Sequence, residues 1–177
     1  MNLTEKQVST KTIYDGCIIK VRVDEVLLPN GEMAKREVVE HNGAVCVVPI
    51  TDDNMVYMVR QFRYAFNEAM LEVPAGKLNS LDEVWADAAI RELEEETGMK
   101  ADELIYIGDF CPSVAIITEV IHMYVAKGLH KGEQNLDDDE FLDVEKYPLA
   151  TLVSMIMSGE IKDGKTIAAI LKVNTMQ

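Results

Sequence analysis

The sequence has few basic residues for its length. Lysine and arginine number 17 among 177 residues, against 31 aspartates and glutamates, which gives a formal net charge of −14 at pH 7. A chain this negative repels nucleic-acid backbones and anionic membrane surfaces, so we expect neither as a partner. If the protein handles a phosphate-rich small molecule, a divalent metal ion is the obvious source of the missing positive charge.

Cysteines and long apolar runs are also scarce. The three cysteines, Cys17, Cys46 and Cys111, are odd in number and widely spaced. They predict neither a disulfide framework nor a zinc site and favour a reducing compartment. The longest apolar runs have the length of a strand, which predicts no membrane span. Residues 1–12 are polar and do not resemble a signal peptide, so we expect a cytoplasmic location.

The N-terminal part has the alternation and turn signals of β-structure. A turn is predicted at 29–32, and a phase change in the alternation predicts a bulge near residues 24–25. Residues 41–43 break the pattern. We therefore divide the chain into an N-terminal β-sheet region (1–43) and a main domain (44–177). The small sheet is expected to pack on the main domain or on a second subunit, because so few strands are not stable alone.

The main domain mixes strands with helices. We expect strands at 44–50, 55–60, 70–73, 104–110 and 119–126, helices at 81–97, 148–158 and 165–173, and a mobile acidic loop at 128–140. Because the strands and helices do not alternate regularly, the predicted fold is α+β, or a layered α/β domain around a mixed sheet.

One predicted helix carries an unusual set of acids. Ser80 and Glu83 have the spacing of a capping box, and Gly98 is placed to end the helix, so we predict a helix from about 81 to 97. Four glutamates lie near its C-terminus: Glu92, Glu94, Glu95 and Glu96. Acidic side chains at this end oppose the helix dipole, so helix formation itself does not explain them.

Three of these glutamates share one helix face. At about 100° per residue, Glu92, Glu95 and Glu96 fall within an arc of roughly 100°. Carboxylates about 6 Å apart repel by on the order of 3 kcal/mol per pair at an effective dielectric near 20. A hard divalent cation with oxygen ligands would reverse the sign of this energy. Arg91 can pair with Glu95 one turn away. The alternative is a solvated acidic face.

The string from 76 to 99, GKLNSLDEVWADAAIRELEEETGM, resembles the Nudix box. Its second half is intact, and its first half has one residue more than the family pattern between Gly76 and Glu83. The resemblance continues in KREVVEHNGAVCVVPI at 35–50, MVRQFRYAF at 58–66, LEVPAGKL at 71–78 and the C-terminal KTIAAI. These segments are similar to bacterial ADP-ribose pyrophosphatases of the Nudix superfamily.

The resemblance implies a Nudix-type α/β/α sandwich around a mixed sheet, with a small N-terminal antiparallel sheet that helps to form a homodimer. It implies a Mg²⁺- or Mn²⁺-dependent enzyme that hydrolyses ADP-ribose to AMP and ribose 5-phosphate. The alternatives are a Nudix hydrolase of a nucleotide sugar or dinucleotide, and a catalytically silent nucleotide-binding module. Residues 113–115, Ser-Val-Ala, stand where the family often has Ser-Pro-Gly, which leaves the sugar side of the pocket undecided.

The resemblance also implies the metal site. Glu92 and Glu96 would ligate the metal ion, Glu95 would ligate it or hold a bound water, and the backbone carbonyl of Ala75 would be a further ligand. Four residues of the Nudix box would be structural, and Arg91 and Glu83 would join the loop and the helix by a salt bridge. The structural residues are Gly76, Glu83, Arg91 and Gly98.

The remaining implied residues would bind substrate or assist catalysis. Arg63 would contact the diphosphate, and Arg36 would lie near the adenine of its own or the partner subunit. Glu72 would lie near the nucleoside half. A loop carboxylate would orient the attacking water, with Glu140 as the first candidate and Asp137, Asp138 and Asp139 as alternatives.

Overall fold

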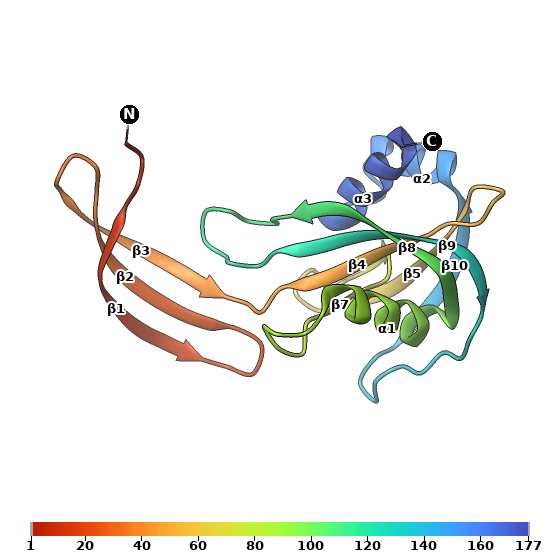
Figure 1. Ribbon diagram of the computed structural model, residues 1–177, viewed down its shortest axis with the longest axis horizontal. Helices are drawn as coiled ribbons and strands as arrows, with labels where there is room; N and C mark the ends of the chain where they lie inside the picture. Colours follow the sequence, from red (N-terminus) through yellow and green to blue (C-terminus); the bar gives the residue numbers. More distant parts are fainter. Residues whose placement is uncertain (1, 177) are drawn as a thin grey trace.

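The first three strands form a separate small sheet. In the computed structural model, which describes residues 2–176, they pair antiparallel in the order β1-β2-β3. Their bounds are β1 (Lys6–Asp15), β2 (Lys20–Leu27) and β3 (Met33–Glu40). Figure 1 shows this sheet extending away from the rest of the molecule, and every residue of β1 is exposed. The sheet therefore buries little apolar surface within one chain.

An irregularity does lie beside the place predicted for a bulge, near residues 24–25, but the extra residue is in the neighbouring strand. The register of the β1–β2 pair shifts between Val26 and Glu25, where β1 has the additional residue Val8, whereas β2 pairs with β3 in unbroken register. The phase change in the sequence has a different cause: Asp24 occupies an inward position beside Val26 and is ion-paired with Arg22. A polar pair thus replaces apolar residues without a change of register between β2 and β3.

The main body contains two further sheets. One is mixed, in the order β7-β4-β9-β8, with β4 and β9 parallel and the other pairs antiparallel. The other is antiparallel, in the order β10-β5-β6. The strands are β4 (Ala44–Pro49), β5 (Met55–Arg63), β6 (Glu68–Glu72), β7 (Ala75–Lys77), β8 (Met99–Phe110), β9 (Ile121–Lys131) and β10 (Leu142–Pro148).

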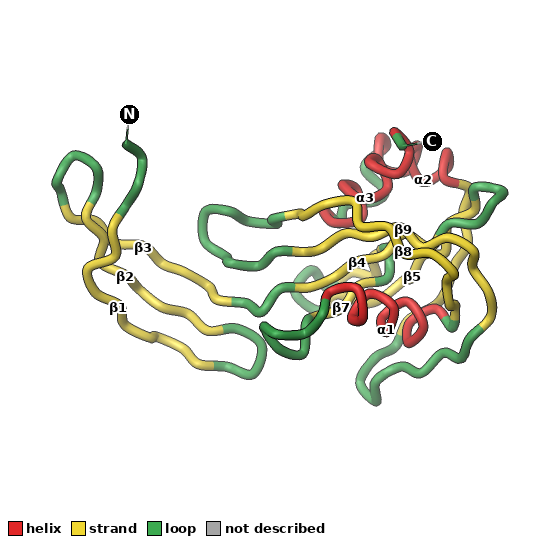
Figure 2. The backbone as a smooth tube through the Cα atoms, viewed as in Figure 1, coloured by secondary structure: helices red, strands yellow, loops and turns green. Residues whose placement is uncertain are grey.

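Three helices cover the mixed sheet from two sides. They are α1 (Trp85–Thr97), α2 (Leu149–Ser158) and α3 (Gly164–Thr175). Figures 1 and 2 show α1 on one side of the β7-β4-β9-β8 sheet and α2 with α3 on the other. The predicted α/β/α sandwich around a mixed sheet is therefore confirmed.

Strand β4 supplies side chains to both layers of the core. Val45 and Val47 pack with Leu93 of α1, whereas Cys46 and Val48 belong to the cluster that includes residues of α2 and α3. A strand that is buried on both faces needs apolar residues at every position, which explains its continuous apolar run. The same packing fixes α1, with its glutamates, against the sheet.

The start of α1 differs from the prediction. The helix begins at Trp85, later than expected, and the capping box is wrong, because Val84 occupies the N-cap and no side-chain hydrogen bond caps the helix. Glu83 instead accepts hydrogen bonds from the backbone N–H of Asn79 and from Arg91. The Glu83 carboxylate therefore joins the loop before α1 to Arg91 and does not cap the helix.

Several strand boundaries also differ. Strands β1, β7 and β10 have no separate counterpart among the predicted strands, and β8 begins earlier than predicted. Strand β9 continues to Lys131, so the loop predicted at 128–140 is shorter at its start. The strands that the sequence did not predict are polar or short, and they form because a neighbouring strand pairs with them. For example, every residue of β10 pairs with β5. No helix among the described residues is long and apolar enough to cross a membrane.

Candidate active site

A cavity of about 810 Å³ opens where α1, β7, the start of α3 and the acidic loop before β10 come together. Both acidic and basic side chains line it, and they come from distant parts of the sequence. Those that matter most below are Glu92, Glu95, Glu140, Arg63, Arg91 and Lys165.

Glu92 lies against the loop that precedes the helix. A Cβ atom built on Gly76 would overlap the carboxyl group of Glu92. The backbone of Gly76 does not have a positive φ, so the glycine is required here by this close approach. The sequence resemblance marked Gly76 as structural, and the contact gives a physical reason for that role.

Arg91 connects the helix to the loop. Its Nη1 donates to Glu92 Oε1 at 2.7 Å and to Glu95 Oε2 at 2.9 Å, and its Nη2 donates to Glu83 Oε1 at 3.3 Å. Burial alone would lower the pKa of Arg91, but the carboxylates of Glu92 and Glu95 raise it, so the guanidinium stays charged. One cation thus holds three carboxylates in place.

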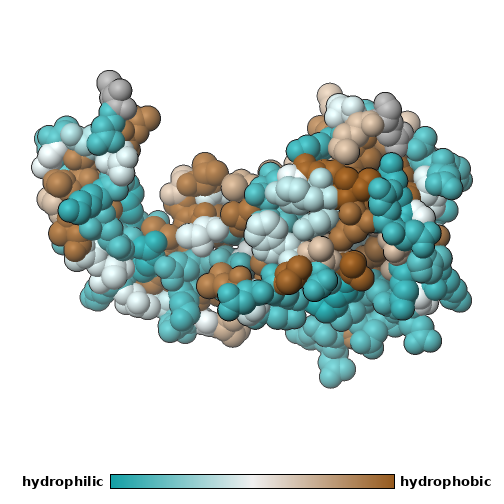
Figure 3. Space-filling model, in the orientation of Figure 1, coloured by the Kyte–Doolittle hydropathy of each residue, from teal (hydrophilic) through white to brown (hydrophobic). Residues whose placement is uncertain are grey.

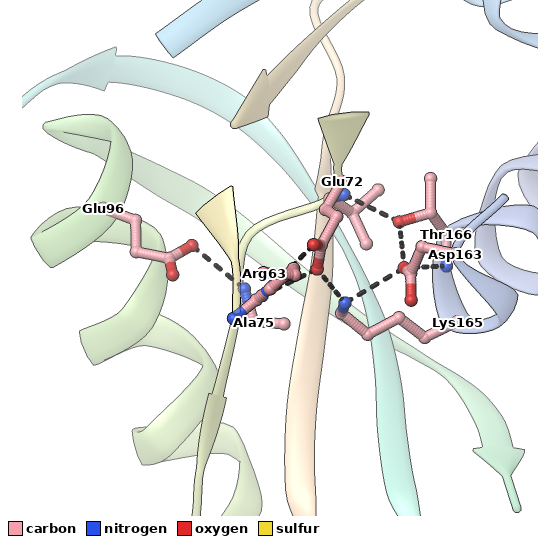
Figure 4. Close-up of polar contacts among 8 residues, drawn as sticks. Arg63, Glu72, Ala75, Glu96, Asp163, Lys165 and Thr166 are labelled. Carbon is pink, nitrogen blue, oxygen red and sulfur yellow. Dashed lines mark hydrogen bonds and ion pairs between the residues drawn. The ribbon is translucent and has the colours of Figure 1, made fainter. Parts of the chain in front are cut away.

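Glu96 is the most deeply buried of the helix glutamates. It is 2% exposed and accepts a hydrogen bond from the backbone N–H of Ala75 at 3.0 Å (Figure 4). Burial, together with the charges of Glu92 and Glu140, raises its pKa to about 8, against the opposing effect of the Ala75 hydrogen bond. Burial likewise raises the pKa of Glu92, although Arg91 opposes it. The positive charges nearby, Arg91 at Glu92 and Arg63 near Glu96, therefore offset only part of the cost of burying these carboxylates.

These acids fit a divalent cation by donor type and placement. Carboxylate oxygens and a backbone carbonyl are the ligands that Mg²⁺ and Mn²⁺ prefer, and a cation would favour the charged forms that burial now disfavours. Among residues 2–176, no group of three or more Asp, Glu, His or Cys side chains is already arranged to hold a metal ion. Part of the donor set is instead engaged by Arg91 and by the Ala75 N–H.

Another part of the cavity lining carries two cations that share one buried acid. Arg63 donates to Glu72 through Nε at 2.6 Å and Nη2 at 2.7 Å, and Lys165 Nζ donates to the same carboxylate and to Asp163 Oδ2 at 3.0 Å (Figure 4). Glu72 is 1% exposed and is not part of the cavity lining, whereas Arg63 and Lys165 are. Glu72 therefore lies behind the cations.

Sequence reasoning missed the three residues of this network that come from α3 and its N-cap. Asp163 accepts from the backbone N–H and the Oγ1 of Thr166, and Lys165 reaches Glu72, which lies far away in the sequence. The KTIAAI segment was noted only for its family resemblance. A lysine in the first turn of a helix carries no local signal of function, so only the tertiary structure reveals this contact.

The other predicted site residues divide into two groups. Glu140, Asp137 and Asp139 line the cavity, and the charge of Glu140 acts on both Glu92 and Glu96. Arg36 does not line it: its Nε and Nη2 donate to Glu5 at 2.9 and 2.6 Å on the N-terminal sheet. One chain alone thus brings the loop acids to the site and leaves Arg36 outside it.

Comparisons with known proteins agree with this arrangement. The NUDIX domain model matches residues 40–170, and the model of the nucleoside diphosphate sugar hydrolase N-terminal domain matches residues 5–39. The chain is 42% identical over 168 residues to a methanol dehydrogenase activator of Bacillus methanolicus, covering 94% of this chain and 90% of that protein. It is 40% identical over 171 residues to an ADP-ribose pyrophosphatase of Bacillus subtilis (strain 168), covering 96% and 92%.

A solved structure shares the fold. The crystal structure of an ADP compounds hydrolase matches with a TM-score of 0.87 and 21% sequence identity, covering 99% of this chain and 96% of that one. The chain belongs to the Nudix family, because the domain model spans most of its length. The predicted fold and the predicted enzyme class, a Nudix pyrophosphohydrolase, are confirmed.

Proposed function

We propose that the protein cleaves ADP-ribose into AMP and ribose 5-phosphate with the help of Mg²⁺ or Mn²⁺. The observation that carries the proposal is the mixed lining of the cavity, in which Glu92 and Glu95 of α1 share one space with Arg63 and Lys165. A diphosphate in this space would meet both oxygen ligands for a metal ion and charged hydrogen-bond donors. The similarity to an ADP-ribose pyrophosphatase supports this substrate.

The acids and the cations of the cavity have different parts in the proposed reaction. A divalent cation bound by the acids would neutralise phosphate oxygens and lower the pKa of the attacking water. Glu92, Glu95 and Glu96 would hold it together with the Ala75 carbonyl. Glu140 would orient the water and accept its proton, while Arg63 would stabilise charge on the phosphate oxygens. The water adds to one phosphorus atom, the bridging P–O bond breaks, and each product keeps one phosphate.

The test is a substrate panel with product analysis. Wild-type protein would be incubated with ADP-ribose, a nucleotide sugar and a dinucleotide, each with Mg²⁺, with Mn²⁺ and with a chelator. We expect AMP and ribose 5-phosphate from ADP-ribose and no turnover with the chelator. Rapid turnover of a nucleotide sugar without turnover of ADP-ribose would contradict the proposed substrate.

The nucleotide sugar remains the second candidate. The N-terminal region matches a family model named for nucleoside diphosphate sugar hydrolases. The loop with Ser113, Val114 and Ala115 supports it as well, since Val114 is 84% exposed and the loop joins the N-terminal sheet through the backbone of Val39. A pocket bordered by this loop could accept a different sugar.

We also propose a homodimer in which residues 1–43 form the dimerisation element of the Nudix domain (44–177). The N-terminal sheet exposes several apolar side chains, and so does the loop between β8 and β9, which lies across an open hollow from it (Figure 3). They are Val8, Ile13, Tyr14, Met33, Val114 and Ile116. A second copy would cover this surface, and sedimentation velocity tests the proposal, because a monomer at micromolar concentration would contradict it.

A cytoplasmic location is the last part of the proposal. All three cysteines are free thiols, and Cys17 and Cys111 are exposed. Exposed free thiols persist in reducing compartments, which supports this location. Cell fractionation of the source organism with an antibody against the protein tests it.

A further inference from the structure

We propose that Lys165 binds a phosphate group of the substrate beside Arg63, and that Glu72 is the positioning residue that aligns both cations. The inference rests on the proposed function, because the phosphate belongs to the diphosphate that the enzyme would cleave. It adds a substrate-binding residue from α3 to the lining of the cavity.

The first support is that one carboxylate, that of Glu72, is shared by two cations. The Glu72 carboxylate receives two N–H groups of Arg63 and one of Lys165, so it holds both cations at fixed positions. It is buried behind them, and the two cations form the cavity wall. A substrate in the cavity would therefore meet the cations and not the acid that aligns them.

The second support is the set of donors that this network leaves over. A guanidinium has five N–H donors and an ammonium has three. Arg63 uses Nε and Nη2 on Glu72, and Lys165 uses two donors on Glu72 and Asp163. For the Nη1 group of Arg63 and the third donor of Lys165, residues 2–176 offer no acceptor in hydrogen-bonding geometry. An anion in the cavity could accept from both.

The third support is the difference from the other arginine of the cavity. Arg91 already donates to three glutamates through both Nη1 and Nη2. Arg63 and Lys165 line the same cavity and keep donors that an anion there can use. Two charged donors side by side suit the non-bridging oxygens of a phosphate group, which can accept from both at once.

The first turn of α3 is anchored so that Lys165 cannot drift away from this position. Asp163 caps the helix through the backbone N–H of Thr166, and the Thr166 hydroxyl accepts from the backbone N–H of Val73 at 2.9 Å. Residue Val73 follows Glu72 directly. The helix start and the Glu72 carboxylate are thus fixed to one another, and the side chain of Lys165 is only 12% exposed.

The rival explanation is that Lys165 serves only as a counter-ion for the buried Glu72. A matched control exists in Lys162, which donates to Glu68 of the same strand, with 2.9 Å to each carboxylate oxygen, but does not line the large cavity. Lys162→Met and Lys165→Met each remove one lysine–glutamate pair of β6. Only the second removes a donor from the cavity.

The experiment measures binding of the two products by calorimetry with Mg²⁺ present, because AMP and ribose 5-phosphate are not consumed. Each product carries one of the two phosphates of ADP-ribose. We expect Lys165→Met to weaken at least one of them by about tenfold or more, Lys165→Arg to keep part of the affinity, and Lys162→Met to change nothing. The KM and kcat for ADP-ribose would be measured on the same variants.

A double-mutant cycle separates binding from charge compensation. In a Glu72→Gln background the counter-ion role toward Glu72 no longer exists and only the pair with Asp163 remains. A lysine that only compensates Glu72 would then show no further effect on product binding when replaced by methionine. We expect Lys165→Met to weaken product binding in that background too. Unchanged affinity for both products in Lys165→Met, or no further loss in the Glu72→Gln background, would overturn the proposal.

The two proposals fail in different ways. If wild-type protein turns over a nucleotide sugar and not ADP-ribose, the proposed substrate is wrong, and the products of that sugar become the probes for Lys165. If ADP-ribose is the substrate and Lys165→Met binds both products as wild type does, only the Lys165 proposal fails. If wild-type protein binds and cleaves no diphosphate compound, both are overturned.

Discussion

The Glu96 carboxylate accepts a hydrogen bond from the backbone N–H of Ala75, so the end of helix α1 and the short strand β7 are joined at 3.0 Å. This contact is made by an acid that is almost fully buried. It anchors the residue whose carbonyl we propose as a metal ligand. Glu96 makes no ion pair with the described residues, and the nearby charge of Arg63 offsets its burial only in part. The stability of the metal-free protein therefore depends on pH.

The first prediction concerns stability without metal. The folded protein keeps the proton on Glu96 up to about pH 8, whereas the unfolded chain loses it near the ordinary glutamate pKa of 4.5. The folded state thus binds more protons in this window, and stability falls as pH rises through it, by up to about 1.4 kcal/mol per pH unit. Glu96→Gln cannot titrate, so its stability should depend less on pH.

Urea unfolding in a chelator at several pH values between about 5 and 8 measures these slopes. The control is Glu94→Gln, because Glu94 lies outside the arc and pairs with Lys100. It should keep the wild-type slope. Equal slopes for wild type and Glu96→Gln would mean that Glu96 ionises normally in the folded protein.

The second prediction adds the metal to the same variant. Saturating Mg²⁺ should raise the melting temperature of wild type more than that of Glu96→Gln, because binding to the folded state stabilises by mass action and the variant has lost a charged ligand. We expect Glu96→Gln to be as stable as wild type or more stable in the chelator, less stable than wild type with Mg²⁺, and nearly inactive. Full activity would show that the acid serves only the fold.

The third prediction uses the contact between Gly76 and Glu92. Gly76→Ala places a methyl group where the Glu92 carboxyl group lies. The end of a flexible side chain can move, so we expect little loss of stability, a weaker apparent affinity for Mg²⁺ and a lower activity. A Mg²⁺ titration of the rate measures this. The control is Gly159→Asn at the end of α2, where an added side chain has open space and asparagine tolerates the positive φ.

The sequence predicted the parts of this site that one helix contains. Glu92, Glu95 and Glu96 share a face because Glu95 and Glu96 follow Glu92 by about one helical turn, and Arg91 pairs with Glu95 as the spacing predicts. Periodicity of this kind is local, so it survives in any fold that keeps the helix. The two-sided core of β4 was predictable for the same reason.

Long-range contacts could not be predicted in this way. The partnership of Glu72 with Lys165 depends on where α3 docks, and strand β10 depends on pairing with β5. The capping box failed because the backbone N–H of Asn79 and the guanidinium of Arg91 bind the Glu83 carboxylate in place of the helix N-terminus. Arg36 lies outside the cavity of its own chain, so its predicted role depends on an assembly.

The fourth prediction tests the acidic loop. Glu140 lines the cavity and acts electrostatically on Glu92 and Glu96, which places it near the proposed metal ligands. If it accepts the proton of the attacking water, Glu140→Gln should lower kcat by about 10²-fold or more. The matched control is Asp138→Asn, since Asp138 does not line the cavity. Comparable kcat values for these two variants would exclude the special role of Glu140.

The last prediction asks whether Arg36 acts on the partner subunit of the proposed homodimer. Arg36→Ala leaves Glu96 intact, and Glu96→Gln leaves Arg36 intact, so each homodimer is defective at both of its sites. If Arg36 reaches across, a mixed dimer has one complete site, built from Glu96 of the first variant and Arg36 of the second. Random mixing makes half of the dimers mixed, so co-expression should restore about a quarter of the wild-type activity.

If Arg36 acts within its own chain, or only pairs with Glu5 as it does here, mixing restores nothing beyond the average of the two variants. Activity of the co-expressed, co-purified pair, compared with the two homodimers mixed after purification, decides between these outcomes.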